Sequence, residues 1–174
     1  MISDTMRDAL NEQIAMEGYA SFYYLSMASW SDNEGLEGCA QYFQRQSAEE
    51  HSHMLRIFDY LSEVDSKAIV PAIAQPPADF DNIQEVFQKT YAHEQKVTES
   101  INKLVELAHQ ENDFTTRNFL DWYVAEQREE EALVRTILDK IRLIGNGPMS
   151  LYYIDKEIEA VNAAELKAAA SEAA

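Results

Sequence analysis

Four long stretches of the 174-residue chain share one pattern of apolar residues, and this pattern restricts the possible folds more than any other feature. Apolar side chains recur at alternating steps of four and three residues, which keeps them on one face of an α-helix. The stripe of the first stretch consists of Leu10, Ile14, Glu17, Ser21, Tyr24 and Ala28. No stretch alternates with period two, so the chain is predicted to be all-α.

The other three stripes follow the same rule of steps. The second consists of Leu36, Ala40, Phe43, Ser47, Glu50, Met54, Ile57 and Leu61. The third consists of Ile83, Phe87, Thr90, Glu94, Val97, Ile101, Leu104 and Ala108. The fourth consists of Leu120, Tyr123, Gln127, Glu130, Val134, Ile137, Ile141 and Ile144. Four helices that each present one apolar face predict a four-helix bundle.

The breaks between the stripes predict the topology. The expected helices span 5–33, 36–63, 82–111 and 114–144, with a short fifth at 149–160 and an Ala/Glu-rich tail at 161–174. Short breaks after the first and third helices favour antiparallel hairpins. The 64–81 connection reaches at most about 60 Å, whereas a 28-residue helix is about 42 Å long. It therefore fits a long crossover between helices two and three, and its Ile69, Val70 and Ile73 suggest that it packs down. Residues 1–160 are expected to form one domain.

Each stripe carries a polar residue near its middle: Glu17, Glu50, Glu94, and Gln127 together with Glu130. A buried, unpaired carboxylate costs several kcal/mol or more. No Lys or Arg lies on any of the four stripes. A cation that is not part of the protein is therefore expected at the centre of the bundle.

The spacing of these residues repeats between the two halves of the chain. Glu17 and Glu50 are 33 residues apart, as are Glu94 and Gln127, and the halves are offset by 77 residues. Glu50-x-x-His53 in one half corresponds to Gln127-x-x-Glu130 in the other. Residues three apart share a helix face, so each pair can reach one metal ion. Oxygen ligands with one histidine suit iron or manganese better than thiol-seeking metals.

Composition narrows the partners and the compartment. The chain has 31 acidic and 14 basic residues, a net charge of −17, which disfavours nucleic acid and anionic membranes as partners. No apolar run approaches the roughly 20 residues that span a bilayer, and the amino terminus does not resemble a secretory signal. Cys39 is the only cysteine, so no intrachain disulfide can form. A cytoplasmic protein is expected.

These motifs together resemble the ferritin family, in its bacterial non-haem type, over about residues 1–160. The resemblance is carried by four sequence stretches: 11–17, Ser47-Ala-Glu-Glu-His-Ser-His-Met54, His93-Glu94, and 126–131. It implies the same bundle with a long crossover, a homo-oligomeric shell of 24 subunits, and storage of a ferric mineral. It also implies a ferroxidase, which oxidises Fe(II) to Fe(III) with O₂ or H₂O₂.

The resemblance further implies which residues bind iron. Glu17, Glu50 and His53 would hold one iron, and Glu50 would bridge to a second iron held by Glu94 and Glu130. Gln127 would be a weak ligand of the second iron or a hydrogen-bond donor beside it. A third iron site would be formed by Glu49, Glu126, Glu129 and the shared Glu130. The alternative for Glu49, Glu126 and Glu129 is ordinary surface charge.

Other residues near these motifs have weaker interpretations. By the resemblance, Tyr24 would supply an electron during oxygen reduction, although core packing also favours an aromatic residue there. Trp122 and Tyr123 are expected to pack, with Trp122 a candidate auxiliary electron donor. The remaining histidines (His51, His93 and His109) are expected at the surface or in packing contacts. Cys39 is expected to be a small buried hydrophobe.

Related families fit less well. A bacterioferritin would need Met for haem at the position of His51 and His at the position of Glu130, so no haem is expected. Rubrerythrin needs several cysteines, and the acidic charge argues against a DNA-protecting miniferritin. Another di-iron carboxylate oxidase or peroxidase of the same fold and a metal-free structural bundle remain alternatives.

The route by which iron enters is not predicted by the resemblance. In animal ferritins two carboxylates line the three-fold channel, and they align with Arg117 and Leu120 here. Neither residue is acidic, so Asp113 and Asp121 are candidates by proximity alone.

Overall fold

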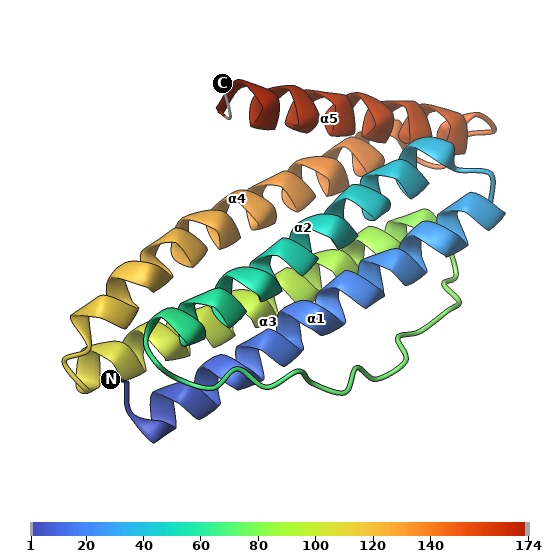
Figure 1. The fold of residues 1–174 in the computed structure, drawn as a ribbon. Coiled ribbons are helices and arrows are strands. Elements are labelled where there is room, and N and C mark those ends of the chain that lie inside the picture. Colours follow the sequence, from blue (N-terminus) through green and yellow to red (C-terminus); the bar gives the residue numbers. More distant parts are fainter. Residues whose placement is uncertain (1, 173–174) are drawn as a thin grey trace.

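The structure, a computed structural model, describes residues 2–172 and consists of five helices with no strand in that range (Figure 1). The helices are α1 (Asp4–Asn33), α2 (Glu37–Glu63), α3 (Ile83–Gln110), α4 (Phe114–Ile144) and α5 (Ser150–Glu172). The predicted all-α bundle with a crossover between helices two and three is confirmed.

Local side-chain chemistry explains where the helices begin and end. The side chains of Ser3, Asn82 and Asp113 accept hydrogen bonds from backbone N–H groups in the first turns of α1, α3 and α4. Such caps satisfy donors that have no partner within the helix. Gly35, between α1 and α2, has φ +75°, a backbone conformation that favours glycine. This conformation ends α1 and lets the chain turn into α2.

The bundle has an apolar core at each end and a polar layer between them. One buried cluster contains Tyr24, Phe43 and Phe87, and the other contains Leu10 and Ile57. On each of the four helices the polar stripe residues lie between the parts that supply these two clusters. Packing at both ends therefore holds the polar residues in register.

The crossover of residues 64–82 runs back along α1, as expected (Figure 1). Hydrogen bonds tie it down: Asn11 accepts from the Ile69 backbone N–H at 2.6 Å, and Ser26 donates to the Pro77 carbonyl at 2.6 Å. Ile73 packs against Gly18, where an added Cβ would meet its Cδ1 at 3.0 Å. Ile69 and Val70 remain exposed, so polar contacts and Ile73 hold the crossover rather than all three apolar residues.

Helix α5 is longer than the 149–160 segment expected from the sequence, because it continues to Glu172. Ala, Glu, Leu and Lys dominate this extension, and all four favour helix. It lies over α2 and α4 (Figure 1). Asp155 accepts from the Cys39 backbone N–H at 2.9 Å, and Asn162 accepts from Arg45 Nε at 2.8 Å. A domain boundary at residue 160 stays a prediction.

Gly38 allows the close approach of α5 to α2, and we expect Gly38→Ala to destabilise this contact. A Cβ at Gly38 would lie 2.4 Å from the Asp155 carbonyl oxygen and 2.9 Å from Glu159 Cβ. Overpacking of this kind costs about 1–3 kcal/mol, so the thermal midpoint should fall. Gly147→Ala is the control, since nothing lies within 4 Å of a Cβ there. Equal midpoints for the two variants would contradict this role of Gly38.

Candidate metal centre

Four carboxylates, one from each of α1 to α4, lie buried between the two apolar clusters. The exposed fractions are 1% for Glu17, 2% for Glu50, 1% for Glu94 and 5% for Glu130. Within residues 2–172 none of them forms an ion pair with Lys or Arg. The burial expected from the stripes is thus observed, and no Lys or Arg in the described part of the chain would balance these carboxyl groups when they ionise.

The first group of the centre joins α1 and α2. Ligand atoms of Glu17, Glu50 and His53 lie within 4.8 Å of one another. His53 Nδ1 is 3.4 Å from Glu50 Oε2. Glu17 Oε1 accepts from Gln13 Nε2 at 2.8 Å, and the Glu17 and Glu50 carboxyl groups are close enough to share a proton. Without that proton, Glu17 Oε2 has no donor among the described residues, which is costly unless a cation or a water satisfies it.

The second group joins α3 and α4. Gln127 Nε2 donates to Glu94 Oε2 at 3.1 Å, and the Tyr24 hydroxyl donates to Glu94 Oε1. On α4, one turn from Gln127, Glu130 Oε2 accepts from Gln46 Nε2 at 3.0 Å. Neutral donors therefore position both carboxylates without neutralising them.

Burial and mutual repulsion shift the pKa values of these groups in a consistent direction. Burial raises the pKa of Glu17 to about 7. Burial, and then the charges of neighbouring carboxylates, raise the pKa of Glu50 and Glu130 well above the ordinary value. Burial also raises the pKa of Glu94. A cation among the four would relieve both the desolvation and the repulsion.

His53 has the opposite shift, which suits a ligand. Burial, assisted by the charge of Arg56, lowers the pKa of His53 to about 4. The imidazole is therefore neutral at pH 7 and keeps a lone pair free for a metal ion. Tyr123 fixes the helix at this point by donating to the His53 carbonyl at 2.7 Å.

The residues expected to form a third site lie toward the surface between α2 and α4. Ligand atoms of Glu49, His53 and Glu126 lie within 4.8 Å of one another. Glu49 pairs with Arg45 at 2.5 Å, and burial raises the Glu49 pKa. Glu129 is exposed and pairs with Arg128 at 3.2 Å, outside this group of three. Glu49, Glu126, Glu129 and Glu130 do line one cavity of about 320 Å³.

The aromatic residues cluster close to the buried carboxylates. Tyr24 is fully buried, and burial followed by the charge of Glu94 raises its pKa well above the ordinary value. The Trp122 ring meets His53 edge-on at 5.2 Å between centroids, with the Arg56 guanidinium 4.3 Å from the Trp122 centroid. Tyr123 is buried in the apolar cluster, as expected for a packing residue.

The other histidines and the cysteine are placed as the sequence predicts. His51 and His109 are exposed. His93 packs against the rings of Tyr23 and Tyr24. Cys39 is buried, and burial raises the pKa of its thiol.

Four positions on or next to α4 were compared with the iron channel of animal ferritins: the aligned Arg117 and Leu120, and the candidates Asp113 and Asp121. Two of the four have a structural role. Leu120 is fully buried in the core. Asp113 caps α4, accepting from the Thr116 backbone N–H at 3.0 Å and from its hydroxyl at 2.5 Å. Arg117 and Asp121 are exposed on α4. Only Asp121 thus combines a free acidic side chain with exposure.

Sequence reasoning missed three residues that hold the centre. Gln13 bonds Glu17, Gln46 bonds Glu130, and Thr98 lies 3.4 Å from Gln127 Nε2. The two glutamines each precede a stripe carboxylate by four residues, one helical turn. That spacing signals the Gln13–Glu17 contact, whereas Gln46 and Thr98 contact residues of another helix and had no such signal.

A comparison with known protein families identifies the family of this chain. The model of the ferritin-like domain matches residues 7–144, from the first turns of α1 to the end of α4. The chain belongs to the ferritin family. Curated relatives and solved structures extend the ferritin match to most of the chain.

Among curated relatives, the bacterial non-heme ferritin of Escherichia coli is 40% identical over 162 residues, 93% of this chain and 98% of the relative. That of Campylobacter jejuni is 45% identical over 159 residues, 91% and 95% of the two chains. Among solved structures, an open-pore ferritin of the archaeon Archaeoglobus fulgidus has a TM-score of 0.89 and 45% identity, covering 91% and 98%. A humanized archaeal ferritin has a TM-score of 0.88 and 43% identity, covering 91% and 96%.

Two further observations concern the helices of this ferritin-family chain. In the described part of the chain, no helix is long and apolar enough to cross a membrane. The matched region ends at Ile144, so α5 and its Glu165, which lines a cavity with Glu49 and Glu126, lie outside the family model.

Proposed function

We propose that the protein oxidises Fe(II) to Fe(III) at the centre between α1 and α4 and stores the ferric product in a protein shell. One observation carries the proposal: four buried carboxylates, which have no Lys or Arg partner among residues 2–172, converge with one neutral histidine. Such a set is expensive as protein alone and becomes favourable around two cations. Family membership and the relatives' names support the same activity.

The proposed roles follow from the two groups. Glu17, Glu50 and His53 hold the first Fe(II), which their mutual 4.8 Å spacing supports. Glu94 and Glu130 hold the second, Glu50 bridges, and Gln127 acts as weak ligand or hydrogen-bond donor. Two Fe(II) and two protons reduce O₂ to H₂O₂, or reduce H₂O₂ to two waters, leaving two Fe(III). Hard carboxylate oxygens favour Fe(III), and the histidine helps to retain Fe(II).

Glu49, Glu126 and Glu129 form the proposed third iron site. Their cavity also reaches Glu130, so an ion leaving the second position meets these carboxylates next. The proposal includes no haem, and it places the protein in the cytoplasm. Neither nucleic acid nor membrane is a proposed partner, given the charge of −17.

Tyr24 is the proposed electron donor, and Tyr24→Phe tests this role. Full reduction of O₂ to water needs four electrons, of which the two irons supply two; in this role Tyr24 and a third iron supply the other two, so that H₂O₂ is not released. The variant should bind Fe(II) normally and release severalfold more H₂O₂ per iron oxidised. Peroxide yield measured by catalase-dependent O₂ return checks this. Unchanged peroxide yield would leave Tyr24 as a packing residue alone.

A shell of 24 subunits is the proposed assembly. Large apolar side chains are exposed on α1 and α2, among them Phe22, Leu25 and Leu55. Others are exposed near the start of α5, including Tyr152 and Tyr153. Exposed apolar patches typically mark subunit contacts. Light scattering should give about 480 kDa, which is 24 times the 19.9 kDa chain, and a monomer would contradict the shell.

An Fe(II) titration tests the proposed activity. The apoprotein should bind two Fe(II) per chain tightly without O₂, and admission of air should produce ferric absorbance faster than in protein-free buffer. The ferric product should then elute with the protein on gel filtration. Ferric product released into solution would favour another di-iron oxidase. Failure to bind iron at any Fe(II) excess would favour a metal-free bundle.

A further inference from the structure

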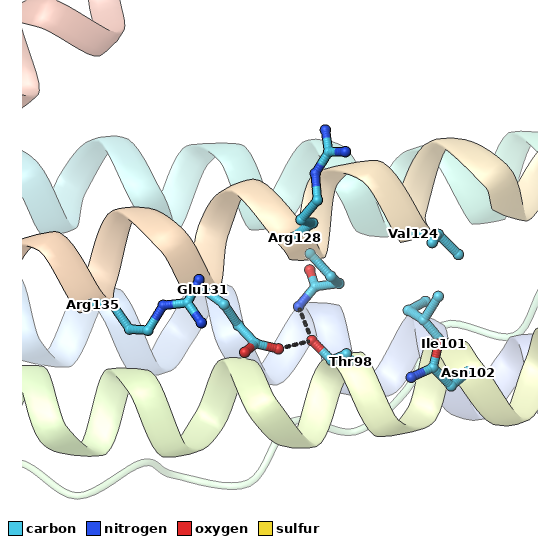
Figure 2. A pocket seen from close by; sticks show the side chains of 8 residues that line it. Thr98, Ile101, Asn102, Val124, Arg128, Glu131 and Arg135 are labelled. Carbon is cyan, nitrogen blue, oxygen red and sulfur yellow. Dashed lines mark hydrogen bonds between the residues drawn. The ribbon is translucent and has the colours of Figure 1, made fainter.

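A cavity of about 260 Å³ lies between α3 and α4 (Figure 2) and shares no lining residue with the acidic cavity between α2 and α4. Thr98 and Asn102 line it from α3, and Val124, Gln127 and Glu131 line it from α4. Gln127 is also part of the buried centre, where its amide donates to Glu94 Oε2. One side chain therefore separates this cavity from the proposed second iron position.

The Gln127 amide nitrogen contacts three acceptors, two of them at longer than usual distances. Its Nε2 lies 3.1 Å from Glu94 Oε2, 3.3 Å from the Glu94 carbonyl oxygen and 3.4 Å from Thr98 Oγ1. Typical N–H···O bonds are about 2.9–3.0 Å. By contrast, the Thr98 hydroxyl donates to Glu131 at 2.6 Å, as Figure 2 shows. Thr98 is thus fixed from the cavity side, and the Gln127 amide lies between it and Glu94, where Nε2 contacts acceptors on both.

The two cavities differ in charge. The cavity between α2 and α4 is lined by one arginine and five carboxylates: Arg45, Glu49, Glu126, Glu129, Glu130 and Glu165. In the cavity between α3 and α4, Arg135 accompanies a single carboxylate, Glu131, whereas Arg128 turns its guanidinium away and pairs with Glu129 (Figure 2). An acidic opening concentrates cations, and an opening whose one carboxylate has an arginine beside it does not. A separate path beside Gln127 suits an uncharged reactant.

We infer that the cavity between α3 and α4 admits the uncharged oxidant, O₂ or H₂O₂, to the iron centre, with Gln127 as its gate. This inference rests on the proposed function, since it assigns the second reactant of the same reaction. Fe(II) would approach through the acidic cavity between α2 and α4. The two reactants would then reach the centre from opposite sides of α4.

The test separates the binding of iron from its oxidation. Val124→Trp fills the cavity from α4, and Asn102→Trp fills it from α3, so one variant serves if the other fails to fold. Asn118→Trp, at an exposed position of α4 that does not line the cavity, is the matched control. Each protein is loaded with two Fe(II) per chain without O₂ and is then mixed in stopped flow with O₂ or, separately, with H₂O₂.

We expect Fe(II) to bind to all variants at the parent rate, and oxidation to slow about fivefold or more in the cavity-filling variants alone. If oxidation by O₂ slows and oxidation by H₂O₂ does not, the cavity admits O₂ only. The reverse result would mean that it admits H₂O₂ only. Unchanged oxidation in both arms would overturn the inference. Slower anaerobic Fe(II) binding would also overturn it, by making the cavity an iron path. If the parent protein binds no iron, the proposed function itself fails.

Discussion

Replacing Glu50 or Glu130 with alanine is expected to slow Fe(II) oxidation by about 100-fold or more. Removal of a group that merely orients a metal ligand already lowers metal affinity or activity about 10- to 100-fold. Glu50 and Glu130 are themselves proposed ligands, so a larger loss is expected. Glu50 is the proposed bridge, and its removal leaves Glu17 and His53 to hold the first iron alone. Stopped-flow ferric absorbance with saturating O₂ measures the effect.

The matched control is Glu99→Ala, which removes an exposed glutamate from α3. It should oxidise iron at the parent rate. Folding is checked by the thermal midpoints of the metal-free proteins, which should not fall through loss of the carboxylates, because burial disfavours their charge. If Glu50→Ala and Glu130→Ala oxidise iron as fast as the parent, the assignment of the centre is wrong.

The metal-free protein is expected to lose stability as the pH rises above about 6.5. Burial raises the pKa of Glu17 to about 7 and those of Glu50 and Glu130 well above the ordinary value. A carboxyl whose pKa is raised by folding stabilises the fold while it is protonated. That contribution is lost as the pH rises through the folded-state pKa. Each carboxyl that is still protonated in the fold but already ionised in the unfolded chain lowers the free energy of unfolding by about 1.4 kcal/mol per pH unit, until it ionises in the fold as well.

The buried histidines act in the opposite direction at lower pH. Burial lowers the pKa values of His53 and His93 to about 4, so their contribution is present above the unfolded value of 6.5 and is lost as the pH falls. The two effects oppose each other between about pH 4 and 6.5. As the pH rises beyond the unfolded value of 6.5, both histidines become neutral in either state, and the carboxylates dominate the slope.

Thermal midpoints of the metal-free protein between pH 6.5 and 8.5 measure this decline. Glu50→Gln should reduce the slope, whereas Glu99→Gln, at an exposed site, should leave it unchanged. Saturating Co(II), which air does not readily oxidise at such ligands, should remove most of the decline, since a bound cation neutralises the ionised carboxylates. A metal-free midpoint that rises over this range would contradict the unpaired burial of the carboxylates.

The bundle and the core of its centre could be predicted because both follow from one periodicity. Steps of three and four residues bring Glu17, Glu50, Glu94 and Glu130 to the inner faces of four helices, and burial then makes the lack of Lys and Arg informative. Any helix of that length imposes this geometry, whatever its neighbours do. The short breaks predict which helices pair as antiparallel hairpins, and the long connection predicts the crossover between the pairs.

Features that depend on contacts between distant residues could not be predicted in this way. The length of α5 depends on the Asp155 and Asn162 contacts with α2 as well as on helix propensity. Thr98 holds the amide of Gln127 from another helix, and nothing in its spacing indicates that contact. Asp113 was a candidate for iron entry by proximity, but its side chain caps α4.

The most direct test of the account is a crystal structure of the protein soaked in Fe(II) in air, with anomalous scattering measured at the iron edge. We predict two iron peaks inside each bundle, one among Glu17, Glu50 and His53, and one among Glu50, Glu94 and Glu130. Peaks confined to exposed carboxylates, with none between α1 and α4, would contradict the central claim that the unpaired buried carboxylates are an iron site.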